Sequence, residues 1–122
     1  MSPNFKIRYS RSSRIVRIHL MGRIGLDERL LAARQLVVRF RHLAHLRLLV
    51  DARYAHSMMT TEEQERLADF VCAHPVLCRA RIAVLFSSRF SPSLGALQNM
   101  VQRGQDARGF LVEGEALEWL NR

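Results

Sequence analysis

The chain has 122 residues, of which 48% are apolar and 25% are charged. This composition excludes a largely disordered chain, and the length suits one domain with its own core. The net charge is +8, but the arginines that carry most of it are spread along the whole chain, which is typical of a solvated surface. We therefore expect a single domain over residues 1–122.

The cysteines and the hydropathy of the chain predict its compartment. Cys72 and Cys78 are too few for a disulfide framework, and they do not form a CxxC pair. The stretch from Met1 to Lys6 lacks the apolar region of a signal peptide, and no segment approaches the roughly 20 apolar residues of a transmembrane helix. These features predict a cytoplasmic protein with reduced thiols.

The first elements along the chain are predicted to be a β-hairpin and a helix. Residues 5–9 and 14–20 alternate apolar with polar side chains, which is typical of strands, and the serine-rich residues between them predict a tight turn. Residues 22–25 have a glycine at each end and predict a loop, after which Asp27 is expected to cap a helix. Apolar residues at steps of three and four predict that this helix ends near residues 41–42.

Two short apolar runs, residues 46–51 and 81–86, are predicted to be buried strands of a parallel sheet. The first run ends at an acid. A helix is expected to follow it, because Thr60 and Glu63 have the spacing of a capping box. Pro75 is expected to end that helix.

The last third of the chain predicts a helix, a strand and a closing helix. Ser91 and Pro92 are a favourable pair for the start of the first helix, and Gly104 ends it. Residues 109–112 predict a short strand, and residues 113–120 predict the closing helix. Because strands alternate with helices, we expect an α/β fold with one mixed, mostly parallel sheet of about five strands and about four helices, opened by a β-hairpin.

The order and spacing of these segments through most of the chain resemble a known domain. The matching segments are a glycine-then-acid helix entry at residues 22–28, a strand ending in an acid at residues 48–51, a buried strand at residues 81–85, and an ending with Phe110 and then residues 115–120. This pattern resembles the STAS domain of sulfate transporters and anti-sigma-factor antagonists, and more closely the SpoIIAA-like bacterial proteins often grouped with lipid-carrying SEC14 domains. The resemblance implies a SpoIIAA-like fold and a regulatory module without catalytic residues.

The resemblance also implies a candidate phosphorylation site. In anti-sigma-factor antagonists, a partner kinase phosphorylates a serine at the start of the helix after the central strand. The matching residues 57–61 lack the Asp-Ser-Ser-Gly pattern of those proteins. Thr60 or Thr61 would stand in the place of that serine.

The loops after the two buried strands form the predicted binding site. The carboxyl ends of parallel strands meet at one edge of a sheet, where open α/β folds bind ligands and where helix N-termini favour anions. Met58 and Met59 beside Tyr54 add an adaptable apolar spot. We expect a protein partner, or a small apolar or anionic ligand, although capping alone also explains the serines and threonines. The predicted binding residues are Asp51, Tyr54, Ser57, Thr60, Thr61, Ser87, Ser88 and Ser91.

The sequence gives less support to metal binding, catalysis or binding of nucleic acid. His42 and His45 have no third ligand nearby in sequence, so no metal and no cofactor are predicted. A nucleophile elbow and a phosphate loop are missing from the sequence, so no enzyme is predicted. The oligomeric state stays open, with a homodimer as the commonest soluble assembly. The alternative function is a basic protein that binds nucleic acid or an anionic membrane, with phosphate contacts from Arg29, Arg34, Arg39 and Arg41.

Overall fold

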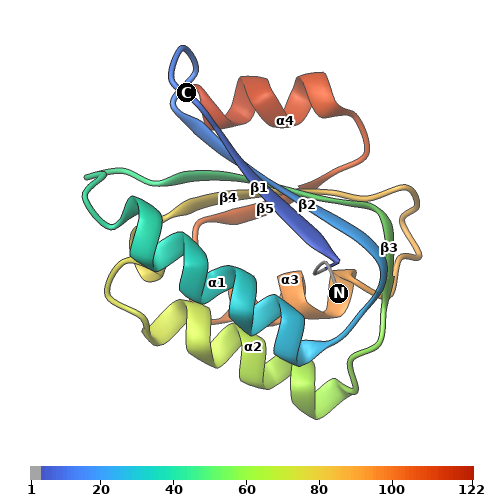
Figure 1. Cartoon of the computed structure of the whole chain (residues 1–122). Helices are drawn as coiled ribbons and strands as arrows, with labels where there is room; N and C mark the ends of the chain where they lie inside the picture. Colours follow the sequence, from blue (N-terminus) through green and yellow to red (C-terminus); the bar gives the residue numbers. More distant parts are fainter. Residues whose placement is uncertain (1–3) are drawn as a thin grey trace.

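The computed structural model describes residues 4–122, which form one sheet of five strands with helices on both faces (Figure 1). The strands lie in the sheet in their order along the chain. β1 (Phe5–Ser10) pairs antiparallel with β2 (Ile15–Ile24), whereas β3 (Arg47–Ser57), β4 (Arg81–Leu85) and β5 (Ala107–Phe110) continue the sheet in parallel. The predicted α/β class, with one mostly parallel sheet that opens with a β-hairpin, is confirmed.

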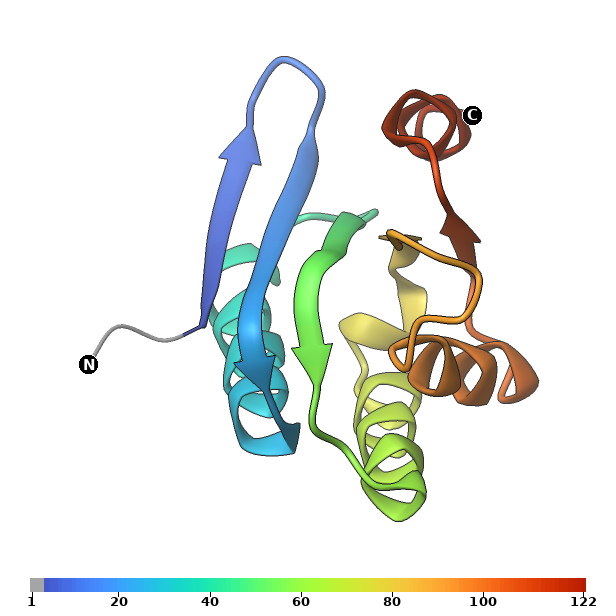
Figure 2. The same cartoon turned by 90° about the vertical axis from the view of Figure 1, so that its right-hand side faces the viewer.

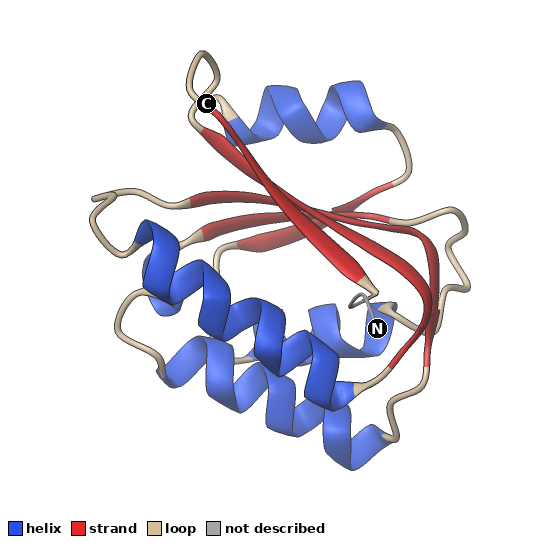
Figure 3. Ribbon diagram, viewed as in Figure 1, coloured by secondary structure: helices blue, strands red, loops and turns tan. Residues whose placement is uncertain are grey.

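The helices are divided unequally between the two faces of the sheet. α1 (Leu26–Phe40), α2 (Thr61–Ala73) and α3 (Leu94–Gln102) cover one face, and α4 (Glu113–Leu120) covers the other (Figure 3). Because each new parallel strand is added at the same edge, right-handed crossovers place their helices on the same face. In Figure 2, α1 lies behind β1 and β2, α2 and α3 lie in the lower part of the view, and α4 lies near the top. Within the described part of the chain, no helix is long and apolar enough to cross a membrane.

Apolar side chains fill two cores, one on each side of the sheet. Leu48 and Leu49 are neighbours in β3, yet Leu48 packs against the three-helix side and Leu49 packs against α4, because successive strand residues point to opposite faces. The larger core is closed by apolar residues of the three helices, among them Leu36, Leu67 and Leu97. Full burial of one such leucine stabilises the fold by about 1.5–3 kcal/mol.

β2 and β3 are longer than their apolar runs predicted. The loop expected at residues 22–25 is wrong, because β2 continues to Ile24 and Gly22 still pairs with β3. The pairing shifts register between His19 and Met21, and Gly22 has a φ of +66°, a left-handed conformation that glycine adopts without strain. Beyond this bulge both strands bend toward the starts of α1 and α2 (Figure 1).

Three predicted element boundaries are also wrong. α1 begins after Gly25, which is extended and makes no side-chain cap, so Asp27 does not cap this helix. α3 begins after Ser93 and not at residues 91–92. β5 begins two residues before the predicted strand 109–112 and ends at Phe110. The three boundaries are shifted by one or two residues, two toward the N-terminus and that of α3 toward the C-terminus. The short 3-10 helix η1 (Leu77–Arg79) before β4 was not predicted.

Candidate functional site

Four of the predicted binding residues line one hollow at the carboxyl edge of the sheet. Tyr54 lies near the end of β3, and Ser87, Ser88 and Ser91 belong to the loop that joins β4 to α3. Parallel strands end at the same edge, so the fold brings the end of β3 and this loop together. Phe90 lines the same hollow, although its sequence pattern marked it only as a loop residue.

The loop uses two of its serines to hold its own shape. The backbone N–H of Phe90 donates to Ser88 Oγ at 3.1 Å, and the backbone N–H of Ser93 donates to Ser91 Oγ at 3.2 Å. Serine often satisfies turn N–H groups in this way. The resulting loop leaves Phe90 92% exposed to solvent.

Large apolar side chains are exposed at this edge of the sheet. Tyr54 is 66% exposed and shares the hollow with Phe90, and exposed Met58 follows the end of β3. The predicted methionine spot is divided, because Met59 packs against the larger core. Exposed aromatic residues that share a hollow are typical of surfaces that bind another molecule.

The polar residues around the start of α2 lie outside the hollow. Thr60 and Glu63 form the predicted capping box: Glu63 N donates to Thr60 Oγ1 at 3.2 Å, and Thr60 N donates to Glu63 Oε1 at 3.0 Å. Thr61 is exposed in the first turn of α2, and Ser57 is half-buried at the end of β3. Phosphorylation of Thr60 or Thr61 stays a prediction.

Asp51 lies inside the protein, apart from the hollow. It is 1% exposed, and Arg53 donates two hydrogen bonds to its carboxylate, from Nε and from Nη2, each at 2.9 Å. Burial raises the pKa of Asp51, but the hydrogen bonds from Arg53 outweigh burial and hold the pKa below its ordinary value. Asp51 is therefore an ionised, fully paired group within the fold.

Asp51 belongs to a network of charges that joins α4 to the sheet. Glu113, at the start of α4, accepts hydrogen bonds from Arg17 at 2.8 Å and from Arg53 at 3.2 Å. The bond from Arg17 is the main cause of the lowered pKa of Glu113. His19 Nδ1 lies 3.7 Å from Asp51 Oδ2, and burial is the main cause of the lowered pKa of this imidazole. Each carboxylate of the network has an arginine partner, so the network holds α4 in place.

Arg29 differs from the other arginines of the first helix. Arg34, Arg39 and Arg41 are exposed, whereas Arg29 is only 9% exposed. The prediction that Arg29 contacts phosphates at the surface is therefore wrong. The sequence held the signal for its burial, because Arg29 lies four residues before Ala33 on the apolar stripe of α1.

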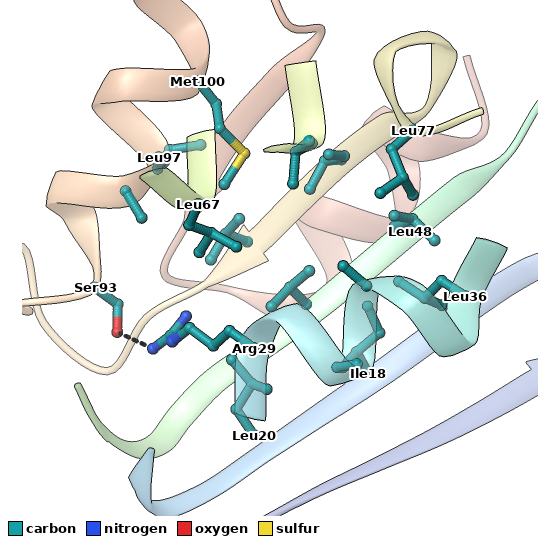
Figure 4. Close-up of a pocket in the computed structure, with 17 residues that line it drawn as sticks. Ile18, Leu20, Arg29, Leu36, Leu48, Leu67, Leu77, Ser93, Leu97 and Met100 are labelled. Atoms are coloured by element: carbon teal, nitrogen blue, oxygen red, sulfur yellow. Dashed lines mark hydrogen bonds between the residues drawn. The ribbon is translucent and has the colours of Figure 1, made fainter. Parts of the chain in front are cut away.

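Arg29 lines a cavity of about 90 Å³ between the sheet and α1, α2 and α3 (Figure 4). Its Nη2 donates to the Oγ of Ser93, the residue that precedes α3, at 3.3 Å. Its buried Nε has no hydrogen-bond partner among the described residues. Arg29 and Ser93 are the polar residues of a wall that is otherwise apolar, with Leu20, Leu36, Leu48, Leu67, Leu77, Leu97 and Met100 among its members.

Neither a protein-family model nor a curated protein matches this chain. Among solved structures, the chain is similar to an uncharacterised protein of the DUF3478 family with a SpoIIAA-like fold, from Shewanella loihica PV-4. The two share 14% sequence identity over 98% of each chain, with a TM-score of 0.60. This chain therefore has the SpoIIAA-like fold that the resemblance to STAS domains implied. One fold hosts many functions, so the fold alone does not define what this chain does.

Proposed function

We propose that this chain is a non-enzymatic binding module that docks an acidic segment of a partner protein at the hollow between Tyr54 and Phe90. The single observation that carries this proposal is the 92% exposure of Phe90 on a loop held by its own hydrogen bonds. An aromatic ring held in water beside a second exposed aromatic offers apolar area for a partner to bury. Buried aromatic residues commonly anchor protein interfaces.

The charge around the hollow favours an acidic partner. Arg53 and His56 line the hollow, and Arg89 precedes Phe90 in the exposed part of the loop. Arg53 is already paired with Asp51, whereas Arg89 has no ion-pair partner within residues 4–122. The chain as a whole carries a net charge of +8. Complementary charge speeds the encounter of two proteins and contributes to specificity.

The side chains of the hollow support a binding role over a catalytic one. Covalent catalysis by serine needs a base within hydrogen-bond reach of the hydroxyl. Among the described residues, His56 makes no hydrogen bond to Ser87, Ser88 or Ser91, and the last two accept bonds from the loop backbone. The hydroxyls therefore serve the shape of the docking surface.

Photo-crosslinking in the host cell tests this proposal. A photoreactive phenylalanine analogue replaces Phe90 in the full chain, and a matched chain carries it at Val38, which is 72% exposed on α1. We expect one protein to crosslink at position 90 and not at position 38. That protein, once purified, should bind the unmodified chain, and Phe90→Ser should weaken binding about tenfold or more, as loss of an interface anchor does.

Three results would contradict this docking mode. The crosslinked protein could appear equally at both positions, or Phe90→Ser could leave the affinity of the purified pair unchanged. Nuclease treatment could also remove the crosslink, which would favour the basic nucleic-acid-binding alternative. A steep loss of affinity between low and physiological salt would accompany that last outcome.

A further inference from the structure

The guanidinium of Arg29 is largely buried and has no anionic partner within residues 4–122. It is 9% exposed, and no carboxylate among the described residues forms an ion pair with it. Its hydrogen bond to the neutral Ser93 hydroxyl is long, at 3.3 Å, and its Nε is unpartnered. Arginine is rarely buried in proteins unless it is paired.

The backbone around Arg29 adds positive charge and not negative charge. Arg29 belongs to the first turns of α1, and Ser93 is the residue before the first turn of α3. The N-terminus of a helix carries a partial positive charge, so both helices favour an anion at this place. Burial lowers the pKa of Arg29 to about 10, and no carboxylate of the described chain opposes this shift. The pKa still leaves the group charged at neutral pH.

The cavity beside Arg29 is small, and its lining is mostly apolar. Its volume of about 90 Å³ is below the roughly 150 Å³ of an engineered apolar cavity that holds benzene. Figure 4 shows Leu67, Leu97 and Met100 reaching into it from α2 and α3, opposite the guanidinium. Such a wall favours a short hydrocarbon tail over a free inorganic anion, because a polar ion would have few partners there.

We propose that this cavity binds a short-chain monocarboxylate, with its carboxylate paired to Arg29 and its tail packed beneath α2 and α3. The planar guanidinium fork matches the two oxygens of a carboxylate, and the unpartnered Nε lies on the same edge of that fork as Nη2, which donates to Ser93 Oγ. Ser93 Oγ–H can then donate to the same carboxylate. Scaled from the six carbons of benzene in roughly 150 Å³, a volume of about 90 Å³ holds a tail of three or four carbons, which is the tail of a four- or five-carbon acid. This site is separate from the docking hollow at Tyr54 and Phe90.

Titration of the unmodified chain is the first test. Butyrate is added while the side-chain Nε–H resonance of Arg29 is followed by NMR, and butyramide serves as a neutral match of nearly the same size. We expect a saturable shift of this resonance with butyrate. Butyramide should bind at least about tenfold more weakly, because hydrogen bonds between charged groups are stronger than those to a neutral group. Affinity should fall again for octanoate, which is longer than the cavity.

Two arginine variants form the second test. Arg29→Met keeps an apolar side chain of similar length and removes the charge, so we expect it to abolish butyrate binding. Arg41→Met makes the same chemical change at an exposed position at the end of α1 and should leave binding unchanged. Equal binding by the Arg29→Met chain would mean that butyrate sits on surface arginines, and this would overturn the proposal.

The unmodified chain decides the matter even if Arg29→Met does not fold. An Nε–H resonance of Arg29 that is unmoved by tens of millimolar butyrate would overturn the proposal. Equal affinities for butyrate and butyramide would overturn it as well. Binding that disappears at moderate salt would point to exposed charges, because screening acts on exposed pairs far more than on buried ones.

Discussion

Two charged residues are buried on opposite faces of the same sheet, and they are held in different ways. Asp51 is 1% exposed on the α4 side and receives two hydrogen bonds from Arg53. Arg29 is 9% exposed on the three-helix side, and its hydrogen bond goes to the neutral Ser93. Both groups lose solvation on folding, but within residues 4–122 only the aspartate has a counter-ion that offsets the loss.

The difference separates a charge that stabilises the fold from one that is available to a ligand. Under α4, the charge of Arg53 is balanced by its ion pairs with Asp51 and Glu113. This network needs no charged ligand to compensate it. On the three-helix side, the guanidinium lines an apolar cavity. On our proposal, the buried charge that has no counter-ion among residues 4–122 marks a binding site, whereas the paired charge serves the fold.

The largest expected effect comes from breaking the paired charge. Asp51→Ala leaves Arg53 without its buried partner, and removal of one member of such a pair costs about 3–5 kcal/mol. Because Arg53 is partly exposed, we expect the lower end, about 3 kcal/mol. Denaturant unfolding measures the change, and a double variant with Arg53→Met should recover part of the loss. A cost below about 1 kcal/mol would show that the pair is not structural.

Acid should have the next largest effect, through the same carboxylate. The pKa of Asp51 is lower in the folded chain than in the unfolded one, so its contribution is complete above the unfolded pKa of about 3.9 and is lost as the pH falls through the folded pKa. Unfolding midpoints measured from pH 6 downward should therefore converge for the unmodified chain and Asp51→Asn. A constant gap between the two chains at all pH values would contradict this assignment.

Removing the unpaired charge should have the opposite sign. Arg29→Met takes an uncompensated guanidinium out of the interior, so we expect the free energy of unfolding to rise by about 1–2 kcal/mol in ligand-free protein. Thermal unfolding with and without butyrate measures both the rise and the loss of any stabilisation by the acid. A destabilised Arg29→Met chain would mean that the arginine stem contributes more through packing than its charge costs.

The smallest expected effect concerns Ser93. Ser93→Ala removes the single hydrogen bond of the Arg29 guanidinium and should lower the free energy of unfolding by about 1 kcal/mol. In the presence of butyrate the cost should grow, because Ser93 Oγ–H also donates to the bound carboxylate, so the variant binds the acid more weakly and gains less stability from it. Ser88→Ala is a matched control in the same loop, and its cost should not depend on butyrate. Identical butyrate dependence in both variants would remove the distinction between the two serines.

Local patterns predicted the order of the elements, because each element buries one apolar face. Strands form where the sequence predicted them, at the alternating residues 5–9 and at the apolar runs 46–51 and 81–86. The ends of β2 and β3 were missed, because pairing across the bulge near Gly22 continues through residues that are polar or loop-like in sequence. Pairing of that kind depends on the neighbouring strand, which no local window contains.

The binding site could also be predicted only in part. Tyr54 and Ser88 could be placed together because parallel strands end at one edge. The contacts of Asp51 could not be predicted, since its partner Arg53 lies at the bulge that follows Asp51 in β3, and no sequence pattern marked that bulge. Arg29 was assigned to the surface from its residue type, although its position on the α1 stripe indicated burial. Only the packed helices show that its charge is unmatched.

Phe90 and Ser93 lie in one short loop between β4 and α3, with one side chain outside the protein and the other facing the cavity. Such a loop can link two binding events without any large motion. If a carboxylate draws Arg29 away from Ser93 and thereby alters the docking of a partner, thermodynamic reciprocity requires the partner to alter acid affinity by the same factor. The concentration of the acid in the cell would then set how tightly the partner binds. Comparing partner affinity with and without butyrate measures that factor directly.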